Sequence, residues 1–273
     1  HSTQVAISPD KQDISITING REGRRYIVTG VKLSGDYLGK DEEFRSLVSI
    51  RPGEPYKAEE VASTQKAFSD RFGLFGHAFA RVELVPRIDR DTGRVEVQLN
   101  ADPGRRVYVR RINVSGNTKT RDEVIRHEFR QFESAWYDGQ RLKLSRDRVD
   151  RLGYFSEVDI ETQEVPGTAD QVDLTINVKE KPTGSLMVGA NFSSADKLSL
   201  SGSIKQDNVF GSGNYLGVEL NTSKSSRTLV LSSVDPYFTR DGISRSLDVY
   251  YRTNKPVNSQ GESYELVTPG ASV

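Results

Sequence analysis

The chain has 273 residues, which is enough for about two domains of ordinary size or for several smaller ones. Its 38 Lys and Arg residues balance its 38 Asp and Glu residues, which excludes a strong overall field that would draw the chain to nucleic acid. The absence of cysteine excludes a disulfide framework and cysteine-ligated metal sites. No apolar run approaches the length that a membrane-spanning helix needs.

A unit of about eighty residues occurs twice between positions 24 and 184, and the end of a third copy precedes it. The two complete copies align at Ser34 and Ser115, which lie 81 positions apart. The closing strands alternate apolar and polar residues, end in Asn and precede a glycine-containing turn: Ile14–Asn19, Val95–Asn100 and Val172–Asn177. A repeat at a fixed period indicates that each copy is one module of an array.

Each complete copy predicts the order strand, helix, helix, strand, strand. In the opening strands every second residue is apolar, which predicts one buried face. These residues are Val31 and Leu33 in the first copy and Ile112 and Val114 in the second. Thr120 and Glu123 of the second copy have the spacing of a capping box, in which the two side chains bond free N–H groups at a helix start.

The helices of both copies carry apolar residues on one face. In the first helices these residues are Phe44, Leu47 and Val48, and then Val124, Ile125, Phe129 and Phe132. In the second helices they are Val61, Phe68 and Phe72 with Gln65 beside them, and then Leu142, Val149 and Leu152. Gly73 and Gly153 are typical of helix C-termini. Hairpins are predicted at Asp89–Gly93 and at Pro166–Gly167.

Three strands with two helices on one face make a small α+β module. Its short sheet has edge strands with unpaired N–H and C=O groups, and such an edge accepts an added strand from a partner. The predicted edge positions are Phe79, Arg81, Glu83 and Val85 in the first copy and Phe155, Glu157, Asp159 and Glu161 in the second. The alternative is that these edges are short and twisted and bind nothing, and the sequence leaves both interpretations open.

After Gly184 the helical pattern gives way to segments of about ten residues with one apolar and one polar face. In the first segment the apolar face consists of Leu186, Val188, Ala190 and Phe192. Long strands and a polar face rich in Ser, Asn and Gly favour a membrane β-barrel over a soluble sandwich, which remains the alternative. A closed membrane barrel needs at least about eight strands, and only five or six are predicted here.

The sequence argues against an enzyme. It contains three His residues and no Gly-x-Ser-x-Gly nucleophile elbow. Gly211-Ser-Gly213 lacks the remaining spacing of a phosphate loop and predicts a tight hairpin. Residues 105–151 hold 13 Lys and Arg against 7 Asp and Glu, but no aromatic platform interleaves with them, so we expect a solvated surface and no nucleic acid. We expect no cofactor and no metal.

Several motifs resemble the BamA family of outer-membrane β-barrel assembly factors, over essentially the whole chain. The last periplasmic repeat of that family is similar to Arg111–Asn117, Thr120–Arg126, Arg130–Trp136, Arg151–Val158, Val165–Gly167 and Val178–Glu180. The family's first barrel strands resemble Gln206–Asn214 and Asp235–Gly242. These motifs occur in the order that the family has, which makes the resemblance specific.

The resemblance implies that each module is a POTRA domain and that the chain is a fragment holding the fourth and fifth. Residues 1–22 would close a preceding POTRA domain, and 23–103 and 104–181 would be complete domains. Residues 182–273 would be the N-terminal strands of a truncated transmembrane β-barrel. The implied location is the bacterial outer membrane, with the POTRA domains in the periplasm.

The function implied by the resemblance is non-enzymatic assembly and insertion of outer-membrane β-barrel proteins. POTRA edges would receive unfolded client chains by strand augmentation, and the edge of the first barrel strand would template incoming strands beside outer-membrane lipid. Accessory lipoproteins would dock on the last POTRA domain through Arg126 and Glu133. Two alternatives remain: a related barrel that secretes or translocates one dedicated substrate, and a soluble repeat scaffold.

Overall fold

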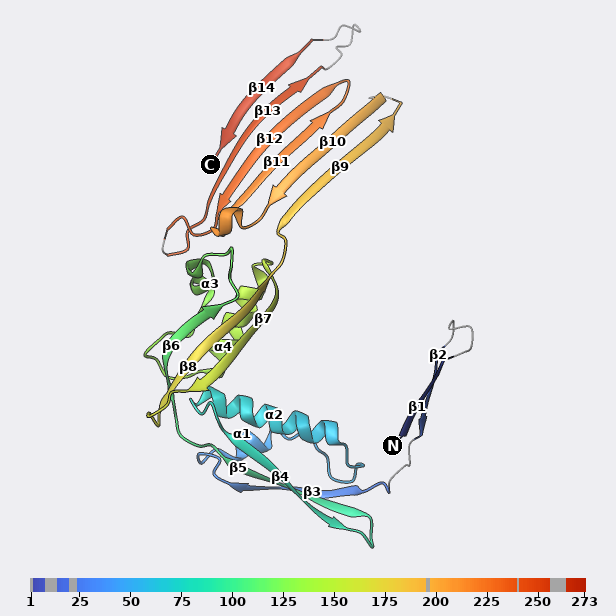
Figure 1. Ribbon diagram of the computed structural model, residues 1–273, viewed down its shortest axis with the longest axis vertical. Coiled ribbons are helices and arrows are strands. Elements are labelled where there is room, and N and C mark those ends of the chain that lie inside the picture. Colours follow the sequence, from blue (N-terminus) through green and yellow to red (C-terminus); the bar gives the residue numbers. More distant parts are fainter. Residues whose placement is uncertain (1, 8–13, 20–23, 195–196, 240, 256–263) are drawn as a thin grey trace. The chain divides into compact units, whose positions relative to one another are not determined.

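The computed structural model describes residues 2–7, 14–19, 24–194, 197–239, 241–255 and 264–273, and the turn predicted after Asn19 lies outside them (Figure 1). The chain divides into two compact units, His1–Arg105 and Arg106–Val273. The first unit begins with an antiparallel pair, β1 (Ser2–Ile7) and β2 (Ile14–Asn19). The predicted closing strand at Ile14–Asn19 is therefore confirmed.

The first complete repeat has the predicted order of elements. They are β3 (Ile27–Gly35), α1 (Asp41–Arg45), α2 (Ala58–Leu74), β4 (Arg81–Asp89) and β5 (Arg94–Asp102). The sheet order is β3-β5-β4, so the closing strand lies in the middle, parallel to β3 and antiparallel to β4. Both outer strands, β3 and β4, have a free edge within this sheet.

Four aromatic rings fill the space between the helices and the sheet of the first repeat. Tyr37, Phe44, Phe68 and Phe72 are almost fully buried, and their ring centroids lie 4.4–6.1 Å apart. Rings at such distances attract one another in addition to the gain from burial. The hydroxyl of Tyr37 donates to the Leu99 carbonyl at 2.9 Å, which ties this cluster to the middle strand.

The second complete repeat has the same topology. Its elements are β6 (Tyr108–Ser115), α3 (Asp122–Glu128), α4 (Gly139–Arg151), β7 (Phe155–Glu164) and β8 (Gln171–Glu180). The sheet order is β6-β8-β7. Gly35 and Gly116, at matching positions, both have positive φ, and a Cβ there would lie 2.1 Å from the Ala101 oxygen and 2.0 Å from the Val178 oxygen. Only glycine fits such a close approach.

Two details of the predicted helices are wrong. Helix α3 ends at Glu128 and the chain is extended at Phe129, so helical spacing does not apply at Phe132, whose side chain is 61% exposed. Thr120 forms no capping box. Its hydroxyl oxygen accepts a hydrogen bond from Asn208, and α3 has no side-chain cap. The predicted helix end near Gly73 is confirmed, because α2 ends at Leu74, and Gly76 beyond it has positive φ.

The remaining strands form one antiparallel sheet. They are β9 (Gly184–Ser193), β10 (Lys197–Gln206), β11 (Tyr215–Thr222), β12 (Ser226–Asp235), β13 (Arg245–Asn254) and β14 (Leu266–Ser272), ordered β14-β13-β12-β11-β10-β9. The short 3-10 turn at Val209–Gly211 joins β10 to β11, where the sequence predicts a hairpin. Among the described residues no helix is long and apolar enough to cross a membrane.

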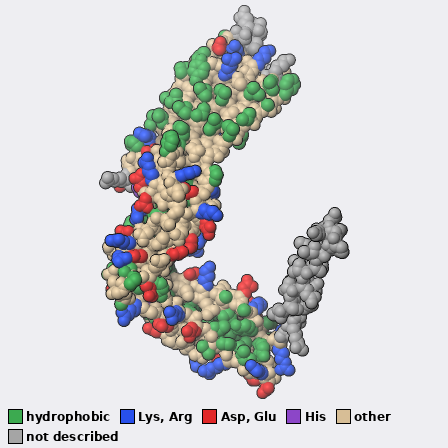
Figure 2. All heavy atoms as spheres, in the orientation of Figure 1, with side chains coloured by type: hydrophobic (Ala, Val, Ile, Leu, Met, Phe, Trp, Pro, Cys, Tyr) green, Lys and Arg blue, Asp and Glu red, His purple; other side chains and the backbone are tan. Residues whose placement is uncertain are grey.

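Strand pairing collects the apolar residues of this sheet on one face. Ala190 pairs with Leu200, Val218 with Leu231, and Leu231 with Val249. Because side chains on a strand alternate between faces, these pairings continue one apolar layer from strand to strand. Many of these side chains are exposed, and Figure 2 shows hydrophobic side chains gathered over this sheet. The alternation predicted from sequence is therefore confirmed.

Candidate functional site: sheet edges and the junction of the second repeat

The outer edges formed by β4 and β7 carry most of the positions predicted from sequence. Arg81, Glu83 and Val85 alternate as exposed residues on β4, and Glu157, Asp159 and Glu161 do the same on β7. Phe79 is not on the edge, because it lies in the connection between the end of α2 at Leu74 and the start of β4 at Arg81. Phe155 begins β7 but is 2% exposed, because the pairing register shifts between Phe155 and Glu157 and the ring lies in the core beside Tyr154.

Arg126 and Glu133 lie together against the free edge of β6. Glu133 Oε1 accepts the backbone N–H of Ile112 at 2.8 Å, and the Arg126 guanidinium donates to the Ile112 carbonyl at 2.7 Å. The two side chains also form an ion pair at 3.7 Å. Their side chains are 42% and 47% exposed, so they hold the strand edge and still present charge to solvent.

The matching place in the first repeat is built differently. Val31 occupies the position of Ile112 and Arg45 that of Arg126, but Pro52 stands where the second repeat has Glu133. A groove of about 230 Å³ lies there, lined by Val31, Leu33, Arg45, Val48, Ile50 and Pro52. No hydrogen bond or ion pair of the Arg45 side chain occurs among the described residues.

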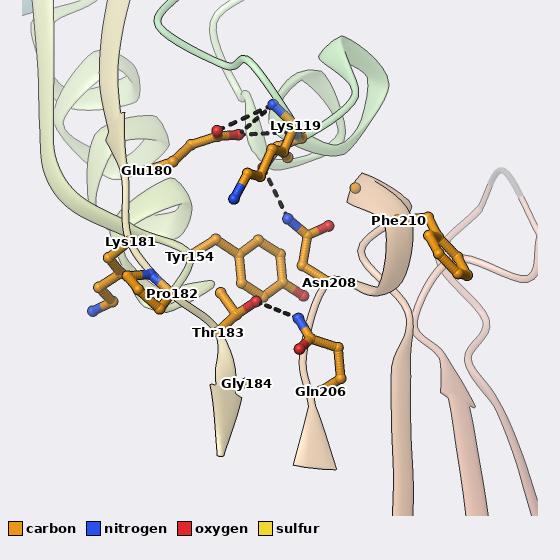
Figure 3. A pocket seen from close by; sticks show the side chains of 12 residues that line it. Lys119, Tyr154, Glu180, Lys181, Pro182, Thr183, Gly184, Gln206, Asn208 and Phe210 are labelled. Atoms are coloured by element: carbon orange, nitrogen blue, oxygen red, sulfur yellow. Dashed lines mark hydrogen bonds between the residues drawn. The ribbon is translucent and has the colours of Figure 1, made fainter. Parts of the chain in front are cut away.

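The second repeat is tied to the six-stranded sheet by polar contacts at the loop before α3 (Figure 3). Asn208 Nδ2 donates to Thr120 Oγ1 at 2.8 Å, and the Arg121 N–H donates to the Gly211 carbonyl at 2.9 Å. Tyr154 Oη donates to the Gly213 carbonyl at 3.1 Å, and burial of this hydroxyl raises its pKa. Thr120, Tyr154 and Asn208 border a hollow of about 790 Å³, which Phe210 also lines with a ring that is 94% exposed.

Glu180, at the end of β8, organises that same loop. Its carboxylate accepts the Thr118 hydroxyl and the backbone N–H groups of Lys119 and Thr120 at 2.7–3.1 Å. Burial alone would raise the pKa of this carboxyl, but the hydrogen bonds outweigh burial and lower it to about 2. The ionised Glu180 carboxylate thus accepts the Thr120 N–H, which Glu123 would accept in the predicted capping box.

A second set of contacts joins α3 and α4 to the turn after β12. Glu128 is almost fully buried, accepts the Tyr237 hydroxyl and pairs with Arg148 at 2.8 Å. The His127 ring stacks on Tyr237 with centroids 4.5 Å apart. Because Glu128 is paired on both oxygens, its buried charge is compensated.

The strand β9 forms one end of the six-stranded sheet. Leu186, Val188, Ala190 and Phe192, the predicted residues of its apolar face, are all exposed. The strand pairs only with β10, so its other edge has backbone groups without a partner strand in the described part of the chain. An edge of this kind can accept a further strand.

Sequence analysis missed the residues that make the junction. Asn208, Glu180 and Tyr237 contact groups 60 or more positions away, and no local pattern marks such contacts. The sequence marks only the turn itself, by Asn208 and Gly211, which both have positive φ in the structure. Among the described residues no group of three or more His, Asp and Glu side chains could hold a metal ion.

Two family models match the chain. The POTRA model, described as a surface antigen variable number repeat, matches residues 26–104 and 107–181. The model of the Omp85 superfamily domain matches residues 208–273. Both POTRA matches coincide with the repeats described above, and the Omp85 match begins in the turn that contacts the second repeat.

Individual relatives agree with these models. The outer membrane protein assembly factor BamA of Neisseria meningitidis is 35% identical over 99% of this chain, which spans 34% of that protein. The crystal structure of Haemophilus ducreyi BamA lacking POTRA domains 1–3 matches with a TM-score of 0.77 at 31% identity, over 90% of this chain and 47% of that one. Haemophilus influenzae BamA POTRA3–5 matches with a TM-score of 0.61 at 30% identity, over 66% of this chain and 71% of that one. With two POTRA domains followed by a sheet that resembles the start of a BamA barrel, the chain belongs to the BamA family.

Proposed function

We propose that this chain takes part in the non-enzymatic assembly and insertion of β-barrel proteins in the bacterial outer membrane. Its curated relatives are named outer membrane protein assembly factors, and the chain spans between about a third and two fifths of their length. The main support for this proposal is the six-stranded sheet, which combines a continuous apolar face with a free β9 edge. An apolar face suits lipid, and a free edge supplies backbone hydrogen bonds without demanding a particular client sequence.

The outer edges of the two POTRA domains would hold client chains before insertion. Their exposed residues on β4 and β7 are mostly charged, as is common for edges that must not aggregate. Strand augmentation on such an edge is weak and reversible, which suits a step that receives clients and releases them. The proposed partners are therefore unfolded outer-membrane protein clients at these edges, outer-membrane lipid at the apolar face of the six-stranded sheet, and accessory lipoproteins.

Photo-cross-linking in outer membranes tests the proposed role of β9. A photoreactive residue in place of Met187 on β9 should capture folding barrel clients of several kinds. The matched position Val230 lies on β12, which has strands on both sides, and should capture none. Equal capture at both positions would contradict templating by β9, and capture of one substrate alone would favour a dedicated secretion barrel.

Arg126 and Glu133 are proposed to dock an accessory lipoprotein. Both side chains are about half exposed, and the neighbouring Phe132 ring is 61% exposed. An exposed aromatic side chain beside charged groups is typical of a protein interface. Because Glu133 also holds the Ile112 N–H, its replacement changes the strand edge as well as the surface.

The docking proposal is therefore tested first at Phe132. Phe132→Ala should reduce binding of purified accessory lipoproteins of the assembly complex, with no change in the hydrogen exchange of β6. Glu133→Lys should reduce binding more strongly, and Glu123→Lys, at an exposed position on α3, is the charge control. Undiminished binding by both Phe132→Ala and Glu133→Lys would exclude this surface.

A further inference from the structure

The free edges of β3 and β6 have the same backbone geometry but different coverage. Both strands contain an irregularity at the same place, between Val28 and Gly30 and between Val109 and Arg111. Both then pair in the same way with the turn that follows the first helix. The Val28 N–H donates to the Glu54 carbonyl at 2.9 Å, as the Val109 N–H donates to the Ala135 carbonyl at 2.9 Å. The two edges can therefore be compared residue by residue.

Beyond that turn the edges diverge. Both backbone groups of Ile112 point away from β8, where the N–H donates to Glu133 and the carbonyl accepts from Arg126. Val31 occupies the same register, so its N–H and C=O also face the free edge. No side chain or turn among the described residues bonds them. The larger Phe129, which is buried, stands where the first repeat has Val48, one of the residues that line the apolar groove beside β3.

We infer that Arg126 and Glu133 close the β6 edge to strand addition, whereas the β3 edge at Val31 and Leu33 is a strand-accepting site. This inference rests on the proposed function and adds to it an edge other than β4 and β7. Edge strands are commonly protected by charged side chains, and here one ion pair covers the exposed backbone groups of a single residue. The closing carboxylate is missing from the first repeat because Pro52 stands in its place.

The occupant that fits the β3 edge is an extended client segment with alternating apolar residues. Its backbone would bond the free groups of Val31 and Leu33, and its apolar side chains would fill the groove over Val48 and Ile50. The guanidinium of Arg45 lines the same groove without an ion pair in the described part of the chain. A segment with an acidic group on its apolar face therefore suits this site best.

A synthetic peptide with the sequence of β12, Ser226–Asp235, has this pattern. Leu229, Leu231 and Asp235 lie on one face of an extended chain. The test mixes this peptide with the full chain carrying a photoreactive residue at Lys32 on β3 or at Asn113, the matching exposed position on β6. Further photoreactive positions at Glu83 on β4 and Glu161 on β7 report the edges of the proposed function.

Two reciprocal substitutions test the role of the carboxylate that the second repeat has at Glu133 and the first repeat lacks at Pro52. Pro52→Glu supplies the carboxylate beside Arg45 and should lower cross-linking at Lys32 about tenfold. Glu133→Ala removes it beside Arg126 and should raise cross-linking at Asn113 about tenfold. A peptide with Asn in place of its Asp should cross-link less at Lys32. Hydrogen exchange of β5 and β8 shows whether each variant is folded, and an unfolded variant is replaced by Arg45→Glu or Arg126→Gln.

The outcomes separate the two proposals. Cross-linking at Lys32 that falls with Pro52→Glu, together with a gain at Asn113 with Glu133→Ala, supports the inference. Cross-linking at Glu83 or Glu161 without any at Lys32 overturns the inference and leaves the proposed function standing. Equal cross-linking at Lys32 and Asn113 in the unsubstituted chain also overturns it, and cross-linking at none of the four edges removes both.

Discussion

The two complete repeats share one topology but stabilise it in different ways. In the first repeat, four aromatic rings fill the core. In the second, Ile125 and Val149 stand at the positions of Phe44 and Phe68, and buried polar groups at the helix ends bond the six-stranded sheet. The first repeat is thus stabilised mainly from within, whereas the second depends in part on its neighbour. Identical topology does not imply identical roles, since the second repeat must also hold a junction.

The largest effect is expected in the aromatic core of the first repeat. Phe44→Ala removes a fully buried ring that contacts Phe68 and Phe72, and we expect it to cost about 3–5 kcal/mol of local stability. The matched change Ile125→Ala in the second repeat should cost about 2–4 kcal/mol, because it removes fewer atoms. Hydrogen exchange of β5 and β8 measures each repeat separately. Equal losses would show that the two cores do not differ as described.

A smaller and symmetric effect is expected at the glycines that follow the opening strands. Gly35→Ala and Gly116→Ala each place a Cβ within about 2 Å of a backbone oxygen at positive φ, so both should lose at least about 1–3 kcal/mol. Gly53→Ala has a similar φ but nothing within 4 Å, and should lose about 1 kcal/mol. Thermal unfolding of the three variants gives the ranking. If Gly53→Ala were the most damaging, close backbone approach would not be the cause.

The junction should show an asymmetry that the cores do not. Glu128→Ala leaves the Tyr237 hydroxyl and the partly buried Arg148 without their shared partner, at a cost of about 1–3 kcal/mol. The expected result is faster hydrogen exchange in both α3 and the turn that contains Tyr237. Glu123→Ala, at an exposed position of the same helix, is the control and should change neither. A response confined to α3 would mean that Glu128 does not connect the two elements.

The parts of this architecture that were predicted from sequence are those with a local signal. Closing strands such as Val172–Asn177 and the apolar face of β9 follow from the alternation of side chains on a strand. The capping box at Thr120 was wrong because Asn208, 88 positions away, takes its hydroxyl, and Glu180 takes the N–H groups. Arg126 and Glu133 were named through a family resemblance, and their bonds to Ile112 could not be read from spacing because they close a strand edge in three dimensions.

The smallest predicted effect is a pH dependence of the loop before α3 in the second repeat. Hydrogen bonds to the charged form lower the pKa of Glu180 in the folded state from its ordinary value of 4.5 to about 2. Its contribution to stability is therefore complete above about pH 4.5 and disappears as the pH falls towards 2. Pro103 occupies the matching position in the first repeat, so that repeat has no such carboxylate.

Amide NMR shifts of Lys119 and Thr120 measure this titration directly. They should change with a midpoint near 2, and Glu180→Gln should abolish the change and make the junction loop equally stable at pH 3 and pH 6. Asp102→Asn, at the end of the closing strand of the first repeat, is the matched control and should leave the titration in the second repeat unaltered. A midpoint near the ordinary value of 4.5 would mean that the loop before α3 holds itself in place without the carboxylate.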